Sequence, residues 1–184
     1  MEKTPHAVIT VTHPAPRRAD LRFMLAHPAH LIALGFGSGL SPWAPGTVGT
    51  LWAWLTFSLL RPFLDDFGFG MLIGASAVVG CWASTVTARH LATADPSAIV
   101  VDEVVAFWLV LWLVTPAGWL GQLVTFGLFR FFDAAKPGPV GWADRRFKGR
   151  PGEPIGWVQG CGVMFDDFVA AGCCLLVVAL WQWW

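Results

Sequence analysis

Two pairs of adjacent acidic residues stand at the edges of long apolar stretches of the chain. Asp102 and Glu103 directly precede one charge-free stretch, and Asp166 and Asp167 directly precede another. Adjacent carboxylates repel each other, and a divalent cation such as Mg²⁺, which prefers hard oxygen ligands, relieves that repulsion. The acids of the first pair can instead stabilise a helix N-terminus, and this alternative stays open. The residues predicted to be catalytic and to bind Mg²⁺ are Asp102, Glu103, Asp133, Asp166 and Asp167.

Basic residues lie close to Asp133 in the sequence. Arg130 and Lys136 flank it, and Arg145 follows in a basic cluster. Such side chains form charge-assisted hydrogen bonds to phosphate oxygens. Asp133 and Lys136 are three residues apart, so a simple ion pair on one helix face is the alternative. We assign Arg130, Lys136 and Arg145 to substrate binding as a hypothesis.

A segment rich in Gly, Pro and Thr, residues 35–50, precedes the apolar stretch that begins near Leu51. It has no Lys and lacks the glycine spacing of a nucleotide-binding loop. Glycines nevertheless let backbone N–H groups approach a phosphate, and Thr47 or Thr50 can cap the helix that follows. A tight structural loop is the alternative. The residues assigned to substrate binding in this segment are Gly37, Ser38, Gly46 and Thr47.

The composition indicates which elements must position these residues. The 184 residues are 55% hydrophobic and 13% charged, whereas soluble domains have about 25% charged residues. Twelve basic residues balance twelve acidic ones, so no net positive field favours nucleic acid and none is expected as a partner. Charges are absent from 23–60, 67–88, 104–129 and 168–184. This segregation is typical of a chain whose solvent is partly lipid.

The expected apolar elements are 51–64, 69–89, 104–115, 118–132 and 166–184. Of these only 69–89 has the clear length of a full span, about 20 residues. The shorter elements are expected to be tilted, re-entrant or stacked. The predicted fold is therefore all-α, a compact membrane-associated helical bundle with a Gly-rich loop. A polar N-terminal segment, 1–22, precedes a single domain, 23–184.

An even number of apolar passes separates every pair of polar islands. Two passes lie between the glycine segment and Asp102, two lie between Asp102 and Asp133, and none lies between Asp133 and Asp166. All of the islands can therefore meet on one face. Basic clusters at 17–22 and 145–150 place that face in the cytoplasm by the positive-inside rule.

Carboxylates, cations and a glycine segment at a lipid boundary favour metal-assisted phosphoryl chemistry on a lipid headgroup. No Cys is followed six residues later by Arg, and no Asp-x-Asp occurs, which argues against two other phosphatase chemistries. The five histidines lie outside the polar islands. Acid–metal catalysis is the hypothesis that remains.

Five ordered motifs resemble the phosphatidylglycerophosphatase A family from about residue 25 to 180. They are Gly37-Ser38-Gly39-Leu40-Ser41-Pro42 through Thr47, Asp102-Glu103, Phe129-Arg130-Phe131-Phe132-Asp133 with Lys136-Pro137, Trp142-Ala143-Asp144-Arg145, and Gly162-Val163-Met164-Phe165-Asp166-Asp167. The resemblance implies an all-helical, Mg²⁺-dependent enzyme of the bacterial inner membrane. Its substrate would be phosphatidylglycerophosphate, its product phosphatidylglycerol, and its acidic motifs would fall on the two acid pairs.

Two departures from the family pattern stand out. Ala106 occupies a position where the family commonly has Gly, and residues 150–161 form an insert rich in Pro and Gly, which predicts a surface loop. A small membrane cation-binding or transport protein that uses the same carboxylates is the alternative function. Such a protein places acids in the middle of spans, whereas here they are expected at element ends. No oligomeric state is predicted.

Overall fold

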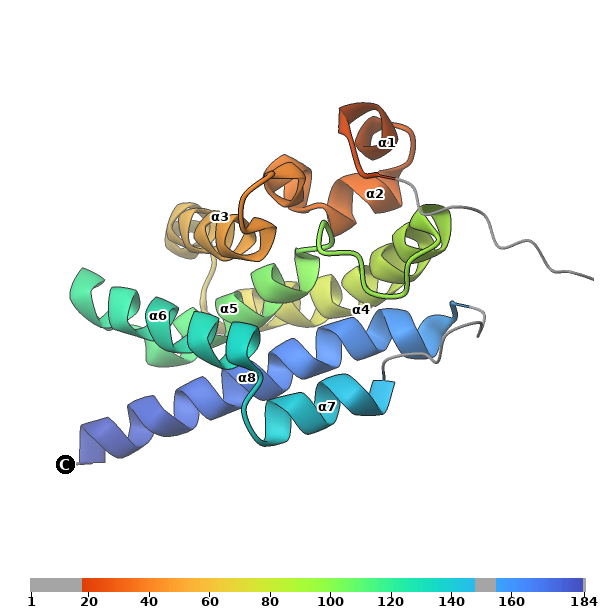
Figure 1. Ribbon diagram of the computed structural model, residues 1–184. Coiled ribbons are helices and arrows are strands. Elements are labelled where there is room, and N and C mark those ends of the chain that lie inside the picture. Colours follow the sequence, from red (N-terminus) through yellow and green to blue (C-terminus); the bar gives the residue numbers. More distant parts are fainter. Residues whose placement is uncertain (1–17, 148–154, 184) are drawn as a thin grey trace, which may run out of the picture.

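The computed structural model describes residues 18–147 and 155–183, and every regular element within these ranges is helical (Figure 1). This confirms the all-α prediction. Two short 3₁₀ helices are η1 (Gly35–Leu40) and η2 (Arg61–Phe63). The α-helices are α1 (Leu21–Leu25), α2 (Pro28–Ala33), α3 (Pro45–Leu60), α4 (Asp66–Leu91), α5 (Val101–Val114), α6 (Trp119–Ala135), α7 (Pro139–Phe147) and α8 (Trp157–Trp183).

Helix α5 is the centre of the bundle and packs against α3, α4, α6 and α8. After its first turn it is apolar on every side, and a helix of that kind is stable only when other elements surround it. Phe107, Val110 and Leu111 are fully buried, and each contributes about 1.5–3 kcal/mol through removal from water. The acids of its first turn are therefore held on the central, most enclosed helix of the fold.

Helix α8 begins nine residues earlier than the sequence indicates, and this corrects two expectations. Residues 157–161 of the expected surface loop 150–161 are helical, while 148–154 lie outside the described residues. One glycine of that expected loop, Gly160, is a site of close packing, as is Gly162 just after it. A Cβ at Gly160 would overlap Thr85 of α4, and one at Gly162 would overlap Phe147 of α7. The second acid pair consequently lies inside α8 and not at its start.

Helix α3 also begins earlier than expected, at Pro45, so the second half of the glycine segment is helical. Pro suits the first helical position because its fixed φ is helical and its missing N–H has no partner there. Neither Thr47 nor Thr50 caps the helix, because Ala44 occupies the N-cap position with φ 43° and no side-chain bond. The first half of the segment is η1, which contacts the loop before α5. A Cβ at Gly39 would overlap the carbonyl of Ala98.

The long helices α4 and α8 are each apolar and long enough to cross a membrane. The shorter α3, α5 and α6 lie alongside them (Figure 1). Large apolar side chains are exposed on the outer surface of the bundle, including Leu51, Leu55 and Leu59 at helical spacing on α3. A surface of this kind suits lipid better than water. The prediction that some of the short helices are re-entrant stays a prediction.

Candidate functional site

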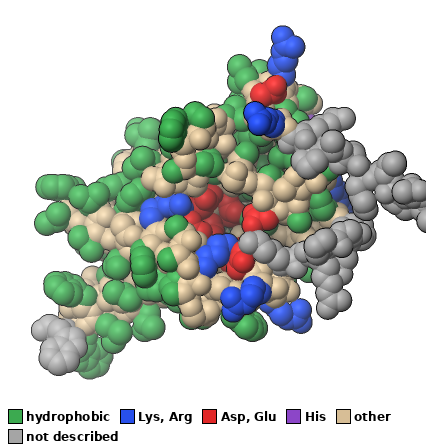
Figure 2. Space-filling view, viewed as in Figure 1, with side chains coloured by type: hydrophobic (Ala, Val, Ile, Leu, Met, Phe, Trp, Pro, Cys, Tyr) green, Lys and Arg blue, Asp and Glu red, His purple; other side chains and the backbone are tan. Residues whose placement is uncertain are grey.

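The acidic residues of α5, α6 and α8 meet at a cavity of about 260 Å³. Figure 2 shows the acidic and basic side chains gathered near the middle of one face, with apolar surface on both sides. The cavity lies where the loop before α5, the first turns of α3 and α5, the end of α6 and the middle of α8 come together. The polar islands therefore meet at one face of the bundle, as the even number of helical passes predicted. The charged residues that line the cavity are Asp95, Asp102, Glu103, Arg130, Asp133, Lys136, Asp166 and Asp167.

Three of the carboxylates are arranged as a metal site would require. One oxygen from each of Asp102, Glu103 and Asp167 lies within 4.8 Å of the others. Asp102 and Asp167 are buried. Glu103 Oε2 and Asp167 Oδ2 are buried atoms that no described residue hydrogen-bonds. Buried oxygen atoms of this kind are costly without a partner, so this group fits a hard divalent cation.

Without such a cation, burial and the neighbouring carboxylates disfavour the ionised forms of Asp102 and Glu103. Burial raises the pKa of Asp102 well above its ordinary value, and the neighbouring Glu103 carboxylate raises it further. Burial also raises the pKa of Glu103, with Asp167 and Asp133 adding to the effect. A positive charge among these oxygens would reverse the balance in favour of the ionised forms.

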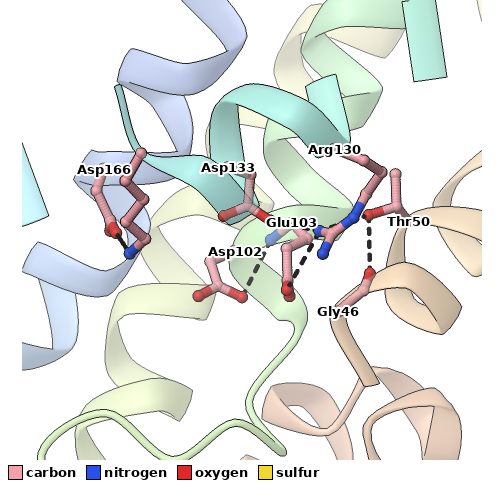
Figure 3. Close-up of polar contacts among 8 residues, drawn as sticks. Gly46, Thr50, Asp102, Glu103, Arg130, Asp133 and Asp166 are labelled. Atoms are coloured by element: carbon pink, nitrogen blue, oxygen red, sulfur yellow. Dashed lines mark hydrogen bonds and ion pairs between the residues drawn. The ribbon is translucent and has the colours of Figure 1, made fainter. Parts of the chain in front are cut away.

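Asp133 is paired with a cation and does not belong to the group of three. Its carboxylate accepts a short hydrogen bond from Arg130 Nη1, one helical turn away on α6. The same guanidinium lies 3.8 Å from Glu103 Oε1 and donates to Thr50 Oγ1 at 3.4 Å. Figure 3 shows Arg130 between the acids of α5 and the first turns of α3. Asp133 therefore lies beside the acidic group and orients a guanidinium toward it.

Lys136 pairs with acids that are distant in the sequence and not with Asp133. Its Nζ donates to Asp144 Oδ1 and to Asp166 Oδ2, both at 2.5 Å. Burial opposes the charge of Lys136, but the two hydrogen bonds and the nearby negative charges outweigh it and raise its pKa. Lys136 stands at the end of α6 with φ 45°. That left-handed backbone turns its side chain away from the helix face that Asp133 occupies.

The first turn of α3 presents backbone to the cavity. The first helical hydrogen bond of α3 is donated by Val48 N to Ala44 O, so the amides of Gly46 and Thr47 precede the helical ladder. Gly46 lines the cavity, and a Cβ there would overlap Glu103 Oε1 and lie 3.1 Å from Arg130 Nη2. Free amides at a helix N-terminus favour anions. The close approach of backbone to both charged side chains requires glycine at this position.

The other residues assigned from the sequence lie outside the cavity lining. Ser38 donates to Gly35 O at 2.9 Å within η1, and Gly37 adopts φ 107° there. Thr47 is half-buried on α3, and Arg145 is exposed on α7. The loop before α5 is supported by α2, through Val100 N donating to Ala33 O at 2.9 Å, and by η1, through the Gly39 contact. Ala106, the departure on α5, is buried in the core.

Three polar residues take part in the site without having been assigned to it from the sequence. Asp95 lines the cavity, Asp144 holds Lys136, and Thr50 contacts Arg130. Asp95 lies seven residues before Asp102, and this proximity was its only signal. The contact of Thr50 with Arg130 spans 80 residues, and no local pattern encodes it.

Comparisons with known proteins agree with the geometry. The family model for Phosphatidylglycerophosphatase A matches residues 31–182. Proteins named Phosphatidylglycerophosphatase A are 35% identical over 158 residues in Escherichia coli (strain K12), covering 84% of this chain and 86% of that protein, and 34% identical over 163 residues in Haemophilus influenzae, covering 89% and 94%. A Bacteroides thetaiotaomicron protein named "Putative phosphatidylinositol-3-phosphatase" is 35% identical over 169 residues, covering 83% and 92%. No solved structure matches the chain significantly.

Proposed function

The chain belongs to the phosphatidylglycerophosphatase A family of phosphatases, and on that premise we propose that it hydrolyses phosphatidylglycerophosphate to phosphatidylglycerol and inorganic phosphate with a bound Mg²⁺. One observation carries this proposal. Buried, unpartnered oxygens of Glu103 and Asp167 face the same cavity as two fixed cations, Arg130 and Lys136. Carboxylates with unpartnered oxygens and cations that can bind an anion are the two halves of a metal–phosphate site.

Asp102, Glu103 and Asp167 would hold the metal, because their oxygens converge within 4.8 Å. Bound there, Mg²⁺ would supply positive charge that polarises the phosphate and lowers the pKa of a water molecule. Mg²⁺ usually keeps several waters and takes only one or two carboxylates with a substrate phosphate. A group of three carboxylates is therefore sufficient to hold the ion. Asp133 and Asp166 then remain paired with Arg130 and Lys136.

Arg130 and Lys136 face the phosphate that would be cleaved. Asp133 fixes Arg130, while Asp144 and Asp166 fix Lys136, so neither cation has to be ordered when substrate binds. The amides at the start of α3 add uncharged donors on the same side. Donors fixed before the reaction stabilise the charge that develops on the phosphoryl oxygens.

The reaction is the hydrolysis of a phosphate monoester. The oxygen of water bonds to phosphorus, the ester P–O bond breaks, and the glycerol oxygen leaves as an alcohol after it gains a proton. The proton lost by water passes to a carboxylate of the acidic cluster. Several carboxylates line the cavity. They can accept the proton from water and give one to the leaving glycerol oxygen, so no group from outside the site is needed.

We place the site at the cytoplasmic face of a bacterial inner membrane. The sequence has relatives in bacteria, and two helices are long and apolar enough to cross a membrane. Arg145 and Arg146 lie on α7, next to the site, and Arg18 and Arg22 belong to the other basic cluster of the sequence. Basic residues are enriched on the cytoplasmic side of membrane proteins.

Phosphate release from lipid vesicles tests the proposal. Purified protein is supplied with phosphatidylglycerophosphate, phosphatidylinositol 3-phosphate or phosphatidic acid, with Mg²⁺ or with EDTA. We expect release from phosphatidylglycerophosphate with Mg²⁺ only, and loss of release in Asp102→Asn. Asp66→Asn is the matched control, because Asp66 is an exposed acid in the first turn of α4 that pairs with Arg61.

Three outcomes would contradict the proposal. Full activity in EDTA would exclude a metal mechanism. Undiminished activity of Asp102→Asn, with the same result for Asp66→Asn, would remove Asp102 from the metal site. A preference for phosphatidylinositol 3-phosphate would keep phosphate-monoester hydrolysis as the reaction but would contradict phosphatidylglycerophosphate as the substrate.

A cation-binding or transport function is the second candidate, and one observation favours it. Asp166 and Asp167 lie inside α8, a helix long enough to span a membrane, where transporters carry acids. Liposomes loaded with a metal-sensitive dye distinguish the two functions. Flux of Mn²⁺ that is lost in Asp167→Asn, together with no hydrolysis of any lipid phosphate, would establish transport.

A further inference from the structure

The buried hydroxyl of Thr50 connects the first turns of α3 to the guanidinium of Arg130 (Figure 3). Thr50 is fully buried. Its Oγ1 donates to Gly46 O at 2.8 Å and accepts from Arg130 Nη1 at 3.4 Å. A hydroxyl that donates in one direction and accepts in the other has a fixed orientation. Thr50 therefore ties a charged side chain of α6 to the backbone that lines the cavity.

Arg130 would sit differently without this tie. Asp133 holds its guanidinium by a short hydrogen bond, and Glu103 attracts it from 3.8 Å. A Cβ at Gly46 would lie 3.1 and 3.3 Å from the two terminal nitrogens of Arg130 and would also overlap Glu103 Oε1, so the guanidinium rests against the first turn of α3. Thr50 is the α3 side chain that offers it an acceptor.

We propose that Thr50 is a positioning residue, which holds the Arg130 guanidinium beside the first turn of α3 so that its remaining N–H groups face the substrate phosphate. This inference rests on the proposed phosphatase function. Loss of the hydroxyl would remove the tie between Arg130 and α3 and leave the guanidinium less firmly fixed, held mainly by Asp133. Phosphate would then be held less tightly, while the metal group of three carboxylates would keep its geometry.

A purely helical role for the hydroxyl is the competing explanation. Thr side chains in helices often bond to the carbonyl four residues earlier. Thr125 on α6 does this with Gly121 O at 2.8 Å and is equally buried. Thr125→Val is therefore a matched control, because it removes the same kind of bond from a residue whose hydroxyl contacts a backbone carbonyl.

The experiment compares Thr50→Val, Thr50→Ser and Thr125→Val in the full-length protein. We measure KM and kcat, inhibition by inorganic phosphate, the Kd of Mn²⁺ and the thermal midpoint. Thr50→Val is expected to raise the inhibition constant for phosphate and KM about fivefold, as suits one long hydrogen bond to a charged group. Thr50→Ser should restore both to within about twofold, and the Kd of Mn²⁺ should not change. Thr125→Val should leave KM, kcat, phosphate inhibition and the Kd of Mn²⁺ at wild-type values and lower only the midpoint slightly.

A double-mutant cycle decides whether Thr50 acts through Arg130. Inorganic phosphate binding is measured in Arg130→Ala with and without Thr50→Val, and the second change is expected to have no further effect. An equal loss in both backgrounds would overturn the inference, as would unchanged phosphate inhibition in Thr50→Val or a weakened Mn²⁺ site. Wild-type protein that hydrolyses no lipid phosphate would refute the proposed function and this inference with it, whereas active wild type with an unaffected Thr50→Val refutes the inference alone.

Discussion

Replacing Gly46 with Ala should impair the chemistry while leaving the fold almost unchanged. The added Cβ would overlap Glu103 Oε1 and lie 3.1 Å from Arg130 Nη2. Both contacts are to the ends of side chains and not to backbone, so the side chains can move aside. The backbone of α3 accepts Ala at this helical position. The change therefore displaces the carboxylate and the guanidinium of the site and little else.

The expected magnitudes follow from these contacts. Relief of the overlap requires Glu103 to move by about 1 Å, and a misplacement of that size costs on the order of 10²-fold in rate. In free energy this is about 2.7 kcal/mol of transition-state stabilisation. Ala is favoured over Gly in a helix by up to about 1 kcal/mol, which offsets the cost of the side-chain movement. The thermal midpoint should therefore shift by less than about 4 °C.

Two other glycines provide the controls. Gly127 on α6 has open space where a Cβ would stand, so Gly127→Ala should keep full activity and gain up to about 1 kcal/mol of stability. A Cβ at Gly49 would lie 2.7 Å from Val100 Cβ in the buried core, so Gly49→Ala should lower stability first. The assay is phosphate release from phosphatidylglycerophosphate vesicles, with thermal unfolding measured on the same preparations.

The reasoning fails if Gly46→Ala keeps wild-type activity. It also fails if the loss of activity is matched by a loss of stability as large as that of Gly49→Ala, because the effect would then belong to the fold and not to the site. A selective loss of activity would support the close approach of α3 to Glu103 and Arg130.

Three further predictions concern the charges of the site. Lys136→Met should lower stability by about 3 kcal/mol, since it leaves the buried Asp166 carboxylate unpaired, and Asp166→Asn in the same chain should recover part of the loss in a denaturant titration. Asp167→Asn should weaken Mn²⁺ binding at least about tenfold, yet raise the thermal midpoint in EDTA, because it removes a buried charge that has an unpartnered oxygen; a lower midpoint in EDTA would contradict this. The raised pKa values of Asp102 and Glu103 mean that the folded, metal-free protein holds more protons than the unfolded chain above the ordinary values of 3.8 and 4.5. Its stability in EDTA should therefore fall as the pH rises above these ordinary values, and Mg²⁺ should reduce that fall; a rise of stability with pH in EDTA would refute the assignment.

The positions of α4, α5 and α6 follow from the sequence because charged residues lie near their ends. The expected elements 69–89, 104–115 and 118–132 correspond to these helices within a few residues at either end. The even number of passes was enough to bring the acidic motifs to one face of the bundle. Hydropathy and charge are properties of each residue, so they can be read from the sequence without knowledge of the contacts between helices.

The features that the sequence did not predict depend on contacts between helices. Gly160, at the start of α8, indicates a loop when taken alone, but Thr85 occupies the space beside it. The partners of Lys136 also depend on contacts between helices. Spacing offered an ion pair with Asp133 as the alternative to substrate binding, whereas the packing of α7 and α8 against the end of α6 supplies Asp144 and Asp166.

The acidic cavity draws its residues from α3, α5, α6 and finally α8, and this order has a consequence for the biosynthesis of the protein. A ribosome has released the acids of α5 and α6 long before Asp167 emerges. Until α8 is in place, the nascent chain would lack Asp167, one of the three carboxylates proposed to hold the metal. On the proposed function, the site would then be completed in one late step, the docking of α8.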